Sequence, residues 1–130
     1  MKYIAVIAVL LGFAFPAFAQ TQMDMVKAAQ ADYFKADKKL NETYQKIQKA
    51  YKQDTLFLRD LKRAQVAWIK FRDLQVIMKY PHKTGLGSAT PMCRFAYIQK
   101  LTEDRTLQLQ EWLDGTPEGD VCTGTTLRGR

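Results

Sequence analysis

The sequence predicts an all-α protein: a long antiparallel helical hairpin, a third helix packed against it, and an irregular C-terminal tail. Apolar residues recur at spacings of three or four along three separate segments, which is typical of amphipathic helices. Proline and glycine gather between the second and third segments and again after the third. The chain has 130 residues, of which 47% are hydrophobic and 25% charged, as in one ordinary globular domain.

Residues 1–19 predict a secretory signal peptide. Lys2 gives a positive start, residues 4–15 are apolar throughout, and A-F-A at residues 17–19 has the pattern of a cleavage site. The apolar run is shorter than the roughly 20 residues that a membrane-spanning helix needs, and Pro16 interrupts it. We therefore expect cleavage at this pattern, a periplasmic or secreted protein, and no transmembrane span in the mature chain.

Residues 24–51 predict the first helix of the mature chain. Lysines lie on its outer side and make up a lysine face, which we define as Lys35, Lys38, Lys39, Lys46 and Lys49. This face is either a solvated surface or a binding surface for an anionic glycan or lipid headgroup. No aromatic residue lies among the lysines, which argues against nucleic-acid binding by base stacking. The opposite, apolar side consists of Val26, Ala29, Tyr33, Ala36, Leu40, Tyr44, Ile47 and Tyr51.

The second helix is predicted to begin after Asp54, a capping residue, and to end at Tyr80, because Pro81 cannot continue it. Residues 81–91 hold both neighbouring prolines and two glycines, so they form a loop. The apolar stripe of this helix consists of Phe57, Leu61, Ala64, Trp68, Phe71 and Met78.

The third helix is predicted over residues 90–113. Thr90-Pro91 resembles a helix start, with threonine as the cap, and Gly115 follows the last apolar residues. The helical domain therefore spans residues 20–115. Residues 116–130 show no periodicity and form an irregular tail.

Cys93 and Cys122 are the two cysteines of the chain. In an oxidising compartment two cysteines usually bridge, so we expect a disulfide that holds the tail to the third helix. The alternative is two free thiols.

Polar residues interrupt the apolar sides of the second and third helices. Arginine on such a side needs partners, because an unpaired buried charge is costly. We expect Arg72 and Arg105 to share acceptors that include Asp37 and Asn41. The full set forms either a structural polar network or a pocket open to a ligand, unless Arg72 extends outward to solvent. Its members are Asp37, Asn41, Gln65, Arg72, Asp73, Thr102 and Arg105.

The sequence contains no motif of a catalytic or cofactor-binding site. It has no H-E-x-x-H, no G-x-S-x-G and no P-loop. His82 is the single histidine and lies in a predicted loop. Glu103 and Asp104 are adjacent, so they point to different sides of a helix and are poorly placed as paired carboxylates. We expect a protein that is not an enzyme and has no cofactor and no metal.

The run A-Q-V-A-W-I-K-F-R-D at residues 64–73 is similar to a signature of the form A-Q-x-A-W-x-x-F-R-D. This signature resembles that of the LprI N-terminal-like family, which is named for a lysozyme inhibitor. The resemblance covers residues 21–113 and implies a secreted helical domain. Four further blocks are similar to family elements: T-Q-M-D-M at 21–25, A-D-K-K-L-N-E-T-Y at 36–44, G-S at 87–88 and L-T-E-D-R at 101–105.

The chain departs from the family pattern at two cysteine positions. Members commonly carry one cysteine in the opening helix and one shortly after the F-R-D block. Ala28 and Val76 stand at these positions here. We infer that a bridge between the first two helices is absent.

The resemblance implies a non-enzymatic binding protein that inhibits or partners a lysozyme-like protein of the cell envelope. The net charge of +7, or one less after loss of Lys2, opposes the approach of animal lysozymes, which are typically cationic. The alternative is a cell-envelope module that binds an anionic glycan or lipid through the lysine face. Added salt weakens such charge-driven binding and separates the two hypotheses.

Overall fold

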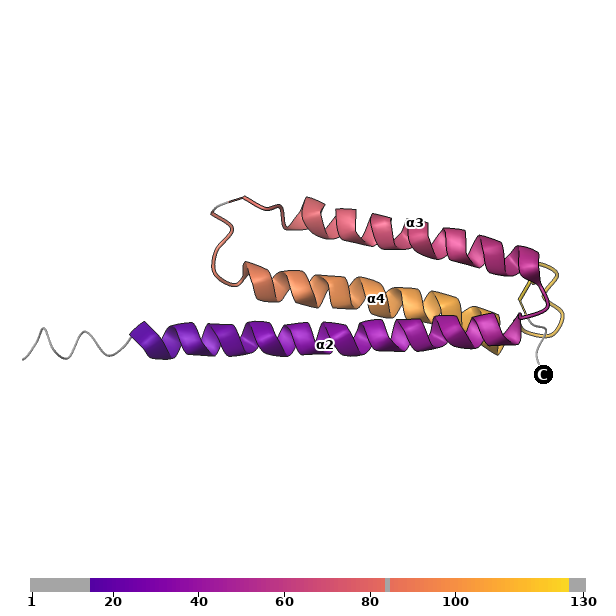
Figure 1. Cartoon of the computed structure of the whole chain (residues 1–130), viewed down its shortest axis with the longest axis horizontal. Coiled ribbons are helices and arrows are strands. Elements are labelled where there is room, and N and C mark those ends of the chain that lie inside the picture. The colour runs from indigo at the N-terminus through magenta and orange to yellow at the C-terminus, as the bar shows by residue number, and fades with distance from the viewer. Residues whose placement is uncertain (1–14, 84, 127–130) are drawn as a thin grey trace, which may run out of the picture.

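The computed structural model describes residues 15–83 and 85–126, which form three helices. These are α2 (Phe15–Ala50), α3 (Thr55–Lys79) and α4 (Thr90–Asp114). Figure 1 shows α3 returning antiparallel to α2, and α4 running alongside α2 in the same direction. The described residues contain no extended β-strand, so the predicted all-α class is confirmed.

α2 begins at Phe15, upstream of the predicted start at residue 24. It therefore runs through the predicted cleavage position. Most of the predicted signal peptide, residues 1–14, lies outside the described residues. Downstream, the inward side of α2 follows the predicted spacing, because Ala36, Leu40 and Ile47 are all buried.

Both ends of α3 lie where the sequence places them. The Asp54 carboxylate accepts the backbone N–H of Phe57 at 2.9 Å, which satisfies one of the free donors of the first turn. At the other end the Tyr80 N–H donates to the Val76 carbonyl at 2.8 Å, and Pro81 follows. Aspartate capping and proline termination therefore fix the length of α3.

α4 ends as predicted but begins differently. Gly115 has a φ of 78°, the left-handed conformation in which glycine is favoured, and its N–H donates to the Glu111 carbonyl. The N-cap is Ala89, and the Thr90 hydroxyl donates to the Leu86 carbonyl at 2.7 Å. The capping role predicted for Thr90 is therefore wrong, since its hydroxyl closes the preceding loop.

α2 and α4 pack most closely, and α3 makes few close backbone contacts with either. Small side chains lie at the α2–α4 contact, because Ala36, Thr43, Thr102 and Thr106 are all buried. Thr102 and Thr106 satisfy their hydroxyls within α4 by donating to carbonyls one turn back, at 2.7 and 3.0 Å. Short side chains, including two threonines whose hydroxyls are satisfied within α4, allow the two backbones to approach.

The hydrophobic core lies where α2 ends, α3 begins and α4 ends. Tyr51 closes it: its hydroxyl donates to the Trp112 carbonyl at 2.9 Å, and its ring stacks on Phe57 at 4.2 Å between centroids. The buried members of the core are Leu40, Ile47, Tyr51, Leu61 and Leu109.

The predicted apolar stripe of α3 is only partly buried. Leu61 lies in the core, but Phe71 is 58% exposed and Met78 is 77% exposed. Apolar residues surround much of this helix, so periodicity alone does not select the inward side. Gln65 and Arg72 are buried and mark that side instead. The prediction that Phe71 and Met78 pack inward is therefore wrong.

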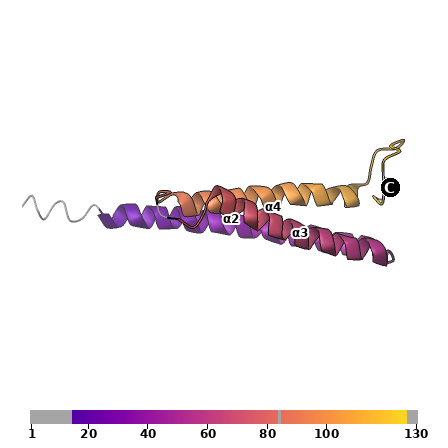
Figure 2. The same cartoon turned by 90° about the horizontal axis from the view of Figure 1, so that it is seen from above.

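The predicted disulfide is absent, because Cys93 and Cys122 are both free. Cys93 lies in the first turn of α4, about 32 Å of helix away from its end. Residues 115–122 span at most about 28 Å when fully extended. The tail is not extended: it turns at Gly119, and the Asp120 N–H donates to the Pro117 carbonyl. The tail therefore stays at the far end of α4 (Figure 2).

We expect both thiols to react when denatured, unreduced monomer is labelled. Mass spectrometry should count two labels per chain and one label in the Cys122→Ser variant. Because Cys122 is exposed and unbridged, this variant should also keep the parent melting temperature. A chain that takes up label only after reduction would contradict the described geometry.

Candidate functional site

Arg72 connects α3 to α2. Its Nε donates to Asp73 at 2.9 Å, a second guanidinium nitrogen lies 2.9 Å from the same carboxylate, and a third lies 3.8 Å from Asp37. Asn41 donates to Asp37 at 3.1 Å and orients that carboxylate. Arg72 is 8% exposed, so it does not extend outward to solvent.

Trp68 lies beside both inward arginines. The Arg72 guanidinium carbon is 5.2 Å from the centre of the Trp68 ring, and that of Arg105 is 5.8 Å away. Arg72 also lies over Tyr33 at 6.0 Å. Such contacts are favourable because the ring face is electron-rich. The aromatic contacts were missed in the sequence, where Trp68 and Tyr33 read only as apolar positions.

Tyr33 reports on the surroundings of Arg72. Burial raises the pKa of its hydroxyl, Arg72 opposes that shift, and Asp37 and Asp73 add to it. The phenol therefore stays neutral while it packs against the guanidinium.

Arg105 does not share the acceptors of Arg72. It donates through Nε to Gln65 at 3.1 Å and through a terminal nitrogen to Gln108 at 3.2 Å. No carboxylate of the described residues lies within ion-pair distance of it. Burial lowers the pKa of the Arg105 guanidinium. Amide oxygens thus satisfy its hydrogen bonds and leave its charge without a counterion.

The predicted polar set is therefore divided into two parts. Asp37, Asn41, Arg72 and Asp73 make a charged part between α2 and α3. Gln65 and Arg105 make a second part between α3 and α4, whereas Thr102 is fully buried and bonds within its own helix. Trp68 contacts both arginines and joins the two parts.

A groove opens between the start of α3 and the end of α4, next to Arg105. We call it the α3–α4 groove; its volume is about 490 Å³. Figure 2 shows these two helix ends lying apart, with the tail at the same end of the molecule. Its walls are mostly apolar. The lining residues are Asp54, Leu56, Phe57, Asp60, Leu61, Ala64, Arg105, Leu109, Trp112 and Thr125.

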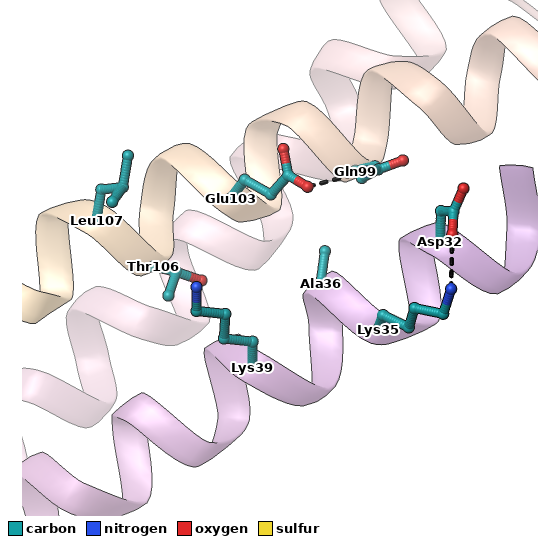
Figure 3. Close-up of a pocket in the computed structure, with 8 residues that line it drawn as sticks. All are labelled: Asp32, Lys35, Ala36, Lys39, Gln99, Glu103, Thr106 and Leu107. Atoms are coloured by element: carbon teal, nitrogen blue, oxygen red, sulfur yellow. Dashed lines mark hydrogen bonds and ion pairs between the residues drawn. The ribbon is translucent and has the colours of Figure 1, made fainter.

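A second groove, of about 390 Å³, lies on the surface between α2 and α4 (Figure 3). Ala36 points toward α4 there, and the charged side chains have partners: Lys35 pairs with Asp32 at 3.0 Å, and Glu103 accepts from Gln99. Lys39 also lines this groove, and it forms no ion pair with the described residues.

The lysine face is exposed along α2 but is partly neutralised. Lys35 pairs with Asp32, and Lys38 lies 3.9 Å from Glu42. Lys39, Lys46 and Lys49 are exposed. Acidic residues of the same helix thus reduce the positive field of the face.

Apolar side chains gather on the outer side of α3 from its middle to its C-terminal end. We call this set the outer α3 surface: Val66, Phe71, Leu74, Ile77 and Met78, which are all exposed. They fall on one side of the helix because their spacings follow its turn. Sequence periodicity could not reveal this surface, since it merges with the inward stripe.

Other kinds of site are not found in the described part of the chain. No group of three or more His, Cys, Asp or Glu side chains is placed to hold a metal ion there. No helix in residues 15–83 or 85–126 is both long and apolar enough to cross a membrane.

We expect Arg72→Ala to lower the free energy of unfolding by about 2 kcal/mol, since it removes the contacts of a buried guanidinium with two carboxylates and two rings. The partly exposed carboxylates regain water, which limits the loss. Arg72→Lys should recover only part of it, because an ammonium lacks the planar contacts. Urea unfolding measures both variants.

Arg59→Ala is the matched control, because Arg59 also pairs with the next residue, Asp60, but lies in solvent on the same helix. It should leave the unfolding curve unchanged. Equal effects of Arg72→Ala and Arg59→Ala would contradict a structural role for Arg72.

Comparison with known proteins places this arrangement in a family. The family model described as "Lysozyme inhibitor LprI" matches residues 16–109, which include α3 and most of α2 and α4. An uncharacterized protein of Rhizobium meliloti (strain 1021) is 35% identical in an alignment that covers 74% of this chain and 76% of the relative. No solved structure matches the chain.

The family match confirms the resemblance seen in the signature block. It extends over well more than half of the chain and includes all the residues that contact Arg72 and most of α4. The chain therefore belongs to the LprI family of lysozyme inhibitors.

Proposed function

We propose that this protein is a secreted or periplasmic, non-enzymatic inhibitor that binds a lysozyme-type muramidase through the outer α3 surface. The family description supplies the target class. The structural observation that carries the proposal is the concentration of exposed apolar side chains on one side of α3.

Such a surface is unfavourable in water unless a partner covers it. Single exposed apolar residues are common, but contiguous ones are typical of protein-binding sites. Burial of apolar area contributes roughly 25 cal/mol per Å², so several large side chains on one side of a helix supply much of an interface. The core gains nothing from Met78, which is 77% exposed.

The signature block itself reaches this surface. Within residues 64–73, Gln65 and Arg72 are buried and maintain the fold. Phe71 belongs to the same block but is 58% exposed, so packing does not account for it. A signature phenylalanine on the outside supports a binding role for this side of α3.

Lys70 adds a charge of the sign that a muramidase cleft attracts. It is exposed on the same side of α3 and forms no ion pair with the described residues. Glycoside hydrolases generally use a pair of carboxyl groups at the cleavage site. An ammonium framed by apolar side chains can approach such a pair when the surface docks.

We expect Leu74→Gln to weaken inhibition of egg-white lysozyme by roughly tenfold, because a polar amide replaces an apolar contact at the interface. The melting temperature should stay within a degree or two, since Leu74 is 55% exposed. Lysis of a bacterial cell-wall suspension, followed by turbidity at several inhibitor concentrations, measures the effect.

Leu107→Gln is the matched control, because Leu107 is 68% exposed on α4, away from the outer α3 surface. It should inhibit like the parent. Equal potency of Leu74→Gln, Leu107→Gln and the parent would refute docking through α3, and a parent that does not inhibit would refute the target.

Added salt should not slow the association of this protein with a cationic lysozyme. The chain carries a net charge of +7, so a cationic lysozyme is repelled at long range. Screening by salt removes that repulsion, and association measured by surface plasmon resonance should be at least as fast at 0.3 M as at 0.05 M salt. Binding to anionic polymer through the lysine face would instead weaken steeply.

A further inference from the structure

We propose that the α3–α4 groove binds an amphipathic carboxylate, with an acyl-type apolar chain along its walls and its carboxylate at Arg105. This ligand site does not depend on the proposed function. The α3 residues that line the groove end at Ala64, whereas the outer α3 surface begins at Val66 and lies on the other side of the helix.

The walls of the groove suit an apolar chain. Leu56, Phe57, Leu61 and Ala64 line it from α3, and Leu109 faces them from α4. Its volume of about 490 Å³ lies within the range of small-molecule sites, which are mostly apolar with a few polar groups. Leu56 is 64% exposed there, so a ligand would cover apolar area that the fold leaves in water.

Arg105 supplies a positive charge that has no counterion among the described residues. Gln65 and Gln108 hold its guanidinium by neutral amide oxygens, and Trp68 lies against it. Two of its donor nitrogens are thereby fixed in direction before a ligand arrives. A carboxylate is the group that guanidinium recognises best, by paired charge-assisted hydrogen bonds.

The two acidic residues of the groove already have other partners. The Asp54 carboxylate caps α3 at the Phe57 N–H. Asp60 lies 3.0 Å from Arg59 and 3.9 Å from Arg63, so its charge is compensated. The groove therefore presents Arg105 as its uncompensated charge among the described lining residues.

Trp112 extends the apolar wall of the groove at the end of α4. Its indole N–H is buried beneath the groove surface and has no acceptor among the described residues, so the ring is its contribution to the lining.

Titration calorimetry with dodecanoate, below its micelle concentration, tests the proposal on the purified protein. The parent should bind one dodecanoate per chain in a saturable isotherm. Dodecanol, which has the same chain without the charge, should bind at least roughly tenfold more weakly, as expected for loss of a charge-assisted contact.

Two variants separate the charge from the apolar wall. Arg105→Gln should weaken dodecanoate binding by roughly tenfold and leave dodecanol binding unchanged. Leu56→Gln should weaken both ligands, because it alters the wall. It also keeps the test decisive if Arg105→Gln fails to fold, since Leu56 is exposed.

Lys100→Gln is the charge-matched control, because it removes one positive charge from α4 at a side chain that is paired with Asp104 outside the groove. It should bind dodecanoate like the parent. The proposal is overturned if the parent shows no saturable dodecanoate binding. It is also overturned if Leu56→Gln binds both ligands like the parent, or if Arg105→Gln and Lys100→Gln behave alike.

Discussion

The arrangement of the fold depends on how two arginines are accommodated beside Trp68. α3 has few close backbone contacts, so long side chains hold it in place. Arg72 reaches Asp37 on α2, and Gln65 accepts from Arg105 on α4. Because these contacts orient Gln65 and Arg72 inward, the opposite side of α3 must face solvent.

The close pairing of α2 and α4 has a different basis. Threonine and alanine at their contact are short enough for the backbones to approach, and the threonine hydroxyls bond within their own helix. α4 therefore packs directly along α2, whereas α3 lies farther from both helices. The α3–α4 groove is the space that this unequal packing leaves between the start of α3 and the end of α4.

Local signals in the sequence predicted the helices well. Asp54, Pro81 and Gly115 act through backbone chemistry that does not depend on the rest of the fold, so they located helix ends correctly. Patterns that require a three-dimensional partner were less reliable. The stripe containing Phe71 failed because α3 is apolar on several sides. The Cys93–Cys122 pairing failed because Cys93 lies in the first turn of α4, whereas the tail turns back on itself beyond the opposite end of that helix.

In the candidate site, too, some residue positions could be predicted from local sequence and others depend on a three-dimensional partner. The inward position of Arg72 could be predicted, since a charge on an apolar side needs partners. The separate partners of Arg105 could not, because Gln108 reads as a surface residue and glutamine has no fixed pairing preference. The threonine contact was also missed, since hydrophobicity patterns count threonine as polar.

The attachment of α3 by side chains has a consequence for the energetics of the molecule. Beyond its core residues Phe57 and Leu61, α3 is held by individual side-chain contacts. This part of the helix can therefore open without disrupting the α2–α4 pair, and its local stability is low. A molecule that binds only the closed state, in which α3 is packed, shifts the equilibrium between the open and closed states toward the closed state. Backbone amides of α3 would then exchange with solvent more slowly when a partner is bound, even at positions that the partner does not touch.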